Sequence, residues 1–241
     1  MKKNNLKKAG IATIISLIVL TVSYLNPADL DFINDIKNSL QDINQISYSL
    51  EEVPEYTGED YVIIDNNVPS FTDYTTDSFE TYSDLDYLDR CGPAYANVSR
   101  ETMPTEERGQ IGMIKPSGWH TVKYDIVDGK YLYNRCHLIG YQLTGENANE
   151  KNLITCTRQM NAETMLEFEN KVADYVKETN NHVLYRVTPI FKGDNLLASG
   201  VQMEAYSVED NGKGISFNVY VYNVQDGITI DYKTGDSKLS N

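Results

Sequence analysis

The sequence predicts an α+β fold in which an antiparallel sheet accompanies one central helix. Hydrophobic residues make up 41% and charged residues 23% of the 241 positions, which is typical of a globular chain with a sizeable core. Within residues 56–241, strand-like runs precede one long amphipathic segment at 160–178, and further strand-like runs follow it. Strands, one helix and more strands indicate an α+β arrangement rather than a parallel sheet.

The elements follow from periodicity and turn residues. Residues 61–64 predict a strand, and residues 71–90, rich in Tyr, Thr and Asp, predict a surface loop. The runs 120–126 and 131–134, separated by Asp-Gly-Lys, predict a hairpin. The helix at 160–178 presents one apolar face, formed by Met165, Phe168, Val172 and Val176. The later strands are expected in the runs 182–191, 197–208, 215–224 and 228–232.

The N-terminus predicts export. Four lysines within the first eight residues precede an uncharged run at 9–25. Residues 1–25 are therefore either a cleaved signal peptide or a signal anchor that attaches the protein to the membrane through residues 9–25, with the N-terminus inside. The expected location of the working domain, residues 56–241, is extracellular in both cases. It is either secreted or held on the outer face of the cell membrane.

Residues 26–55 predict an acidic helical stalk. Isoleucines and a leucine recur every three or four residues over 29–50. Residues 26–90 carry 16 acidic and 2 basic side chains, a net charge of −14, so nearly all the acidity of the chain precedes Cys91. A solvated stalk is the first interpretation, and a segment that repels or mimics DNA is the alternative.

Charge excludes only one class of nucleic-acid protein. The formal net charge of −14 argues against a protein that coats nucleic acid with a broad basic surface. It leaves room for an enzyme that contacts phosphates through a few placed Arg and Lys side chains.

Only one of the three histidines stands where chemistry is expected. His120 and His182 lie in predicted strands, where packing or solvent exposure is the ordinary outcome. His137 leaves a strand beside Arg135 and precedes a long loop rich in asparagine. A histidine titrates near neutral pH and can accept a proton from water, so His137 is the candidate general base.

Residues 132–170 resemble the active-site segment of the DNA/RNA non-specific endonucleases, the ββα-metal or His-Me finger nucleases. Their D-R-G-H tetrad ends the second strand of a hairpin and is followed by a loop and a metal-binding helix. Here the tetrad reads Asn134-Arg135-Cys136-His137, and NLIT-x-TR-x-MN ends at Asn161. A looser similarity extends from Tyr61 to Tyr232. The sequence is most similar to the secreted and membrane-anchored nucleases of Gram-positive bacteria.

The resemblance implies a fold and a site. The fold is a ββα-metal core, with Asn161 as the ligand of Mg²⁺, for which Mn²⁺ can substitute. His137 is the general base, Arg135 contacts phosphate, and Glu169 orients water on the ion. Mg²⁺ prefers oxygen ligands and retains several waters, so one amide oxygen is a sufficient protein ligand. The supporting or substrate-binding candidates are Asn134, Asn149, Asn152 and Arg158.

Helix geometry limits the role of the glutamate. Eight residues separate Asn161 from Glu169, which corresponds to a rotation of about 80° on an α-helix. Both side chains therefore reach one ion directly only if Asn161 precedes a bend or lies at the helix start. Glu163 and Glu167 are the competing carboxylates.

Three positions differ from the family pattern. Asn134 replaces the usual Asp, and Cys136 and Cys156 stand where Gly is common. The resemblance brings the two cysteine segments together, which suggests a Cys136–Cys156 disulfide; two free buried thiols are the alternative. The third cysteine is Cys91, and the absence of a C-x-x-C pattern argues against a thiolate zinc site.

The expected activity is Mg²⁺-dependent hydrolysis of DNA, with RNA as a further substrate, without sequence preference and leaving 5′-phosphate ends. An alternative is a catalytically inactive, surface-displayed binding domain on the nuclease fold. A sequence-specific homing-type endonuclease is a second alternative, against which the export signal argues, because its substrate would lie inside the cell.

Overall fold

The computed structural model describes residues 46–240. The predicted export signal at 1–25 and most of the predicted stalk lie outside these residues. In the part of the chain that is described, no helix is both long enough and apolar enough to cross a membrane.

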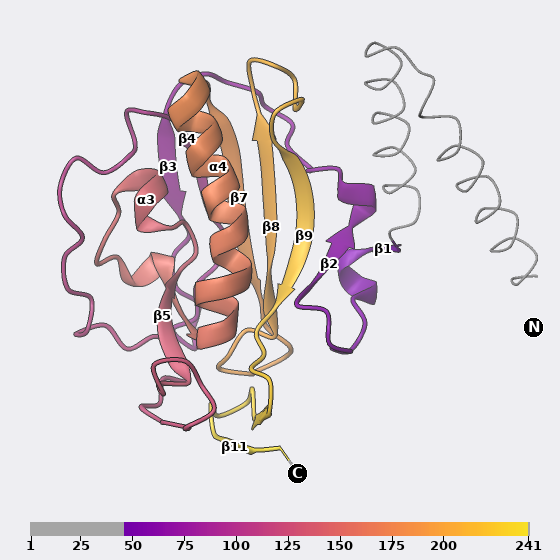
Figure 1. Cartoon of the computed structure of the whole chain (residues 1–241), viewed down its shortest axis with the longest axis vertical. Helices are drawn as coiled ribbons and strands as arrows, with labels where there is room; N and C mark the ends of the chain where they lie inside the picture. Colours follow the sequence, from indigo (N-terminus) through magenta and orange to yellow (C-terminus); the bar gives the residue numbers. More distant parts are fainter. Residues whose placement is uncertain (1–45, 241) are drawn as a thin grey trace, which may run out of the picture. The chain divides into compact units, whose positions relative to one another are not determined.

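The centre of the fold is a seven-stranded sheet with the order β1-β2-β9-β8-β7-β4-β3 (Figure 1). Every neighbouring pair is antiparallel except the short parallel pair of β1 and β2. The strands are β1 (Ser47–Tyr48), β2 (Tyr61–Ile64), β3 (Phe79–Tyr82), β4 (Ala94–Val98), β7 (Val183–Ile190), β8 (Gly200–Ser207) and β9 (Ser216–Tyr222). The predicted antiparallel α+β arrangement is confirmed.

One helix covers a face of this sheet. The π-helical turn η5 (Met160–Thr164) leads directly into α4 (Met165–Thr179), which ends where Asn180 adopts a left-handed conformation. The buried face of α4 packs on alternate residues of β7, such as Val183 and Val187, because side chains on a strand alternate between faces. Figure 1 shows α4 lying along the sheet with β5 and α3 beside it.

A separate two-stranded ribbon carries the tetrad. β5 (Tyr133–His137) pairs antiparallel with β6 (Leu153–Thr157), and Cys136, Ile154 and Cys156 join the core beneath α4. Between the two strands lie α3 (Tyr141–Thr144) and η4 (Glu150–Asn152). A further small ribbon, β10 (Ile228–Ile230) with β11 (Ser237–Leu239), lies near the C-terminus.

The hairpin predicted over 120–134 is shorter than expected. Its two runs meet at an antiparallel bridge between Lys123 and Tyr131, flanked by backbone hydrogen bonds from the Tyr124 amide to the Lys130 carbonyl and from the Leu132 amide to the Val122 carbonyl. The strand of the tetrad, β5, pairs with β6 instead. The reason is burial: every residue of β6 is buried, whereas His120, Lys123 and Lys130 are exposed or partly exposed. Local alternation predicted residues 120–126 as the partner of the tetrad strand, but burial in the apolar core favours pairing with β6.

Two further segments differ from expectation. The loop predicted at 71–90 contains β3, which pairs with β4. The helix predicted over 29–50 does not reach residue 50, because Ser47 and Tyr48 form the strand β1. The short helical turn η2 (Leu50–Glu52) follows this strand. Tyr48 and Leu50 pack on Tyr220 and Tyr222 of β9, so the last part of the predicted stalk belongs to the folded domain.

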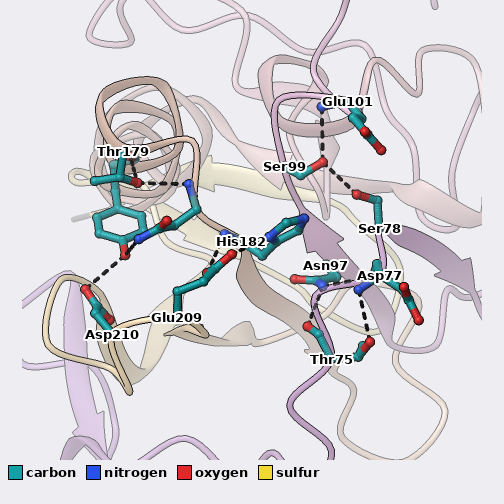
Figure 2. A network of polar contacts seen from close by, with 12 residues as sticks. Thr75, Asp77, Ser78, Asn97, Ser99, Glu101, Thr179, His182, Glu209 and Asp210 are labelled. Atoms are coloured by element: carbon teal, nitrogen blue, oxygen red, sulfur yellow. Dashed lines mark hydrogen bonds and ion pairs between the residues drawn. The ribbon is translucent and has the colours of Figure 1, made fainter.

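Polar contacts fasten loops to one end of the sheet (Figure 2). His182, just before β7, places its Nδ1 2.6 Å from Oε1 of Glu209, which follows β8. The fully buried Asn97 of β4 donates to the carbonyl oxygens of Thr75 and Asp77. His182 therefore has a structural pairing here, as expected for a histidine in a strand.

Cys136 and Cys156 lie diagonally across the β5–β6 ribbon, opposite Ile154 and Asn134 respectively. The structure joins them as a disulfide with a Cα–Cα separation of 5.9 Å and a sequence separation of 20 residues. The remaining cysteine, Cys91, is a buried free thiol whose Sγ donates to the carbonyl oxygens of Glu150 and Leu153.

We predict that this disulfide forms in the exported protein and stabilises it. A crosslink closing a loop of this length contributes about 3 kcal/mol to the free energy of unfolding, so the Cys136→Ser/Cys156→Ser double variant should lose stability of that order. The measurement is urea denaturation of the wild type and the variant. Alkylation of the denatured wild type should add one group without reductant and three with it. Three groups without reductant would contradict the bridge.

Candidate active site

His137 is held as a neutral imidazole at the end of β5. Its Nε2 lies 2.7 Å from the carbonyl oxygen of Asn147, and because that oxygen only accepts, Nε2 carries the proton. Nδ1 is then the acceptor for Nη2 of Arg108 at 3.2 Å. Burial lowers the pKa of His137 to about 4, the Asn147 carbonyl opposes this shift, and the Arg108 charge adds to it. The side chain is therefore an unprotonated base at neutral pH.

The asparagine-rich loop holds the backbone around this histidine. Asn152, which is fully buried, accepts from the Ile139 amide and donates to the Ile139 carbonyl, at 2.9 and 3.0 Å. Asn149 accepts from the Lys151 amide and so starts the η4 turn. Both predicted supporting residues thus fix the loop that follows β5, and the loop in turn presents the Asn147 carbonyl to His137.

Asn161 is tied to the strand of the tetrad. Its Nδ2 donates to Oδ1 of Asn134 at 3.3 Å, which directs the amide nitrogen toward β5 and leaves Oδ1 of Asn161 outside this contact. The Asn134 amide supplies the acceptor oxygen that an aspartate would supply at this position. The Asp-to-Asn difference therefore keeps this contact while removing a negative charge from the site.

The π turn changes the relation between Asn161 and Glu169. A π turn, with its i→i+5 bonds, rotates less per residue than an α-helix, so the offset of about 80° expected for a regular helix becomes smaller. Both side chains lie against β5 or the residues that follow it: Asn161 contacts Asn134, and Glu169 lies against Gly140. Asn161 therefore lies within a local irregularity at the start of the helix.

Glu169 occupies space that a side chain at position 140 would need. An ideal Cβ on Gly140 would lie 2.5 Å from Oε2 of Glu169, so a larger residue there would displace the carboxylate. Burial raises the pKa of Glu169 to about 8, although a hydrogen bond from Gln142 and the charge of Arg108 act in the opposite direction. Glu163 and Glu167 are exposed, which leaves Glu169 as the carboxylate enclosed at this site.

Arg108 is the site residue that the sequence interpretation missed. Its charge lowers the pKa of both His137 and Glu169. The loop that carries Arg108 is held by contacts with residues outside the loop. Tyr141 donates to the Glu106 carbonyl at 2.8 Å, and Gly109 packs closely against the Asn147 amide. Nothing in the spacing between Arg108 and the tetrad marks it, so the sequence alone gave no signal for this contact.

Arg135, predicted to contact phosphate, and Arg158, a supporting or substrate-binding candidate, both have protein partners. Arg135 donates through Nη2 to the Gly112 carbonyl at 2.9 Å and through Nε to the Ile114 carbonyl, and its guanidinium stacks 3.9 Å from the Trp119 ring centroid. Arg158 forms a salt bridge with Asp128 at 2.9 Å. Arg135 therefore anchors the segment that follows Arg108.

The donor set around Asn161 fits a hard cation that keeps most of its waters. Over residues 46–240, no group of three His, Cys, Asp or Glu side chains comes together as a cation cage. The amide oxygen of Asn161, with a carboxylate on the next turns of the same helix, supplies oxygen atoms only, which is the preference of Mg²⁺.

A buried histidine at the end of one ribbon strand, with an asparagine at the start of the helix after the second strand, is the arrangement of the ββα-metal nuclease fold. The family model described as DNA/RNA non-specific endonuclease matches residues 69–209. The chain belongs to the DNA/RNA non-specific endonuclease family and is a nuclease.

Solved structures agree with this fold. NucA from Streptococcus agalactiae with a magnesium ion bound is 24% identical, with a TM-score of 0.70 over 87% of this chain and 97% of that one. The Sda1 nuclease with a bound zinc ion is 29% identical, with a TM-score of 0.59 over 68% of this chain and 80% of that one. A protein described as an extracellular endonuclease is 20% identical, with a TM-score of 0.55 over 70% and 90%.

We predict that metal-free protein loses stability between about pH 4.5 and pH 8 because of Glu169. Its pKa is raised in the folded state, so the folded protein retains a proton that the unfolded chain releases over this range. Glu169→Gln should therefore gain stability relative to the wild type as the pH rises. Denaturant titrations in chelator at both ends of the range measure the difference. The exposed Glu163→Gln serves as the control, and an equal, pH-independent difference for both variants would refute the assignment.

Proposed function

We propose that the chain is an extracellular, metal-dependent endonuclease that hydrolyses phosphodiester bonds of DNA, and also of RNA, with little sequence preference. The observation that carries this proposal is the neutral His137, whose Nε2–H is fixed by the Asn147 carbonyl and whose Nδ1 faces Arg108. An oriented base beside a phosphate-binding cation is the arrangement that phosphodiester hydrolysis requires.

His137 takes a proton from the attacking water at Nδ1. The Asn147 carbonyl holds the ring in the tautomer with a free Nδ1 and stabilises the imidazolium that forms. Because burial depresses the pKa of His137, the base needs no prior deprotonation at neutral pH, and it releases the proton readily after the reaction.

Arg108 binds the phosphate and leaves His137 when it does so. In the free protein, the Arg108 guanidinium donates a hydrogen bond to the lone pair of His137 Nδ1, so this nitrogen cannot accept a proton from water. A phosphate oxygen is a stronger, charge-assisted acceptor than a neutral imidazole, so an incoming phosphodiester attracts Arg108 and frees the base. Arg135, with its protein partners, supports the loop rather than the substrate.

Asn161 would hold the metal through Oδ1, with Asn134 orienting its amide and Glu169 orienting water. When bound, Mg²⁺ would neutralise phosphate charge and stabilise the leaving oxygen, and Mn²⁺ would substitute for it. A metal ion beside Glu169 would keep that carboxylate ionised, against the effect of burial. The products would carry 5′-phosphate ends by analogy with the family.

Two observations support the substrate class and the location. Arg108, the residue proposed to bind the substrate, would contact a phosphate group. Because contacts to phosphate oxygens carry no sequence information, such a site would cut with little sequence preference. The N-terminal lysines and the uncharged run at 9–25 indicate export, and one structural neighbour is described as an extracellular endonuclease. Residues 1–25 would be cleaved or would anchor the enzyme to the outer face of the membrane.

We predict that His137→Ala abolishes degradation of plasmid DNA while the fold persists. Supercoiled plasmid is incubated with wild type and variant in Mg²⁺, in Mn²⁺ and in chelator, and the products are separated on a gel. Wild type should cut only with a metal. The exposed His120→Ala is the control and should retain activity. A His137→Ala protein that cuts at the wild-type rate would disprove the mechanism, and a wild type that binds DNA without cutting it would favour the binding-domain alternative.

We predict that Arg108→Ala lowers kcat/KM for plasmid or oligonucleotide DNA by about 100-fold, because a charge-assisted phosphate contact that acts in the transition state is lost. Steady-state kinetics at constant ionic strength measures the change. Arg158→Ala, which removes an arginine paired with Asp128, is the matched control and should change kcat/KM less than threefold. Equal losses for both variants would mean that Arg108 contributes only general charge.

A further inference from the structure

The π turn that carries Asn161 is held at both ends by one carboxylate. Asp60, which directly precedes β2, accepts from Nε2 of Gln159 at 2.7 Å through Oδ1. Its Oδ2 accepts from the Thr164 hydroxyl at 3.3 Å. Gln159 precedes η5 and Thr164 is its last residue; both are 6% exposed, and Asp60 is partly buried.

Such a two-point contact distinguishes a π turn from an α turn. Residues five apart on an α-helix are rotated by roughly 140° from each other and cannot both face one carboxylate. In a π turn, with i→i+5 bonding, residues 159 and 164 lie more nearly in line. The Asp60 carboxylate therefore satisfies both partners only while the π turn persists, and it favours that turn over a regular helix.

Asp60 is itself fixed by neighbouring contacts. Its carbonyl oxygen accepts from the Tyr222 amide at 3.0 Å, which ties it to the end of β9. The following residue, Tyr61, packs edge-to-face on Phe168 of α4 with ring centroids 5.2 Å apart. From the other side, the Gln159 side-chain oxygen accepts from the Asp226 amide at 2.8 Å. The turn is thus enclosed between the chain before β2 and the chain after β9.

We propose that Asp60 is a positioning residue that holds the Asn161-bearing turn in its π form and thereby sets the affinity of the site for its divalent metal. The inference rests on the proposed function for Asn161. Asp60 lies before residue 69, where the family match begins, so this chain supplies the clamp from a segment outside the matched region. Without the carboxylate, the turn can rewind toward an α-helix, which rotates Asn161 away from Asn134.

The experiment compares the full-length wild type with Asp60→Ala, Asp60→Asn and Glu59→Ala. Glu59 is the adjacent, exposed acidic residue, so Glu59→Ala removes the same charge without the clamp. Hydrogen exchange of the metal-free proteins is followed at the amides of residues 160–166. Mg²⁺ affinity is measured by calorimetry, and the Mg²⁺ concentration for half-maximal plasmid cleavage is measured separately.

In Asp60→Ala, exchange at these amides should rise at least tenfold, and the Mg²⁺ dissociation constant should rise by about tenfold, as for other residues that orient a metal ligand. Asp60→Asn should be intermediate and Glu59→Ala unchanged. Thr164→Val, which removes one arm of the clamp while keeping the side-chain shape, provides the same test if Asp60→Ala does not fold. Unchanged exchange and unchanged Mg²⁺ affinity in the folded variants would overturn the proposal.

The two proposals fail in different ways. A wild type that does not cleave nucleic acid would refute the proposed function, while the exchange rates of the metal-free variants would still report on the clamp. A wild type that cleaves normally, together with an Asp60→Ala protein of wild-type exchange and metal affinity, would refute only the role of Asp60.

Discussion

The pairing of β5 with β6 is the constraint on which the site depends. It places His137 opposite Leu153 at one end of the ribbon, and it brings Asn134 to the side of the ribbon that meets the start of the helix. The ribbon in turn is fixed because Cys136, Ile154 and Cys156 share a core with α4. A one-residue slip of β5 would turn its side chains to the opposite faces and remove His137 and Asn134 from these contacts.

Burial tunes the two titratable groups of the site in opposite senses. It lowers the pKa of His137 to about 4 and raises the pKa of Glu169 to about 8, so both favour the neutral form. Arg108 lowers both pKa values, which keeps His137 unprotonated and opposes the protonation of Glu169. One cation between a base and a carboxylate therefore adjusts the protonation of both, and a bound divalent ion would act on Glu169 in the same sense.

Prediction from sequence succeeded where a motif is continuous along the chain. The helix after the tetrad begins and ends within two residues of the expected positions, because its apolar residues recur at helical spacing. The strands after it are likewise where alternation and turn residues place them. Prediction was incomplete where the partner was distant: the strand of the tetrad pairs with β6 and not with 120–126. The protein partners of Arg135 and Arg158 likewise come from loops that no local pattern reveals.

The antiparallel α+β class and the bounds of the helix can be inferred from the chain alone because they depend on local periodicity, and the tetrad motif carries the resemblance to the family. The groups that surround His137 follow only from the folded arrangement. Arg108 and the Asn147 carbonyl reach it from loops whose approach depends on packing, and Asp60 reaches the π turn from outside the matched region. Contacts of this kind join segments tens of residues apart, and their free energy depends on the assembled core rather than on any local preference of the chain.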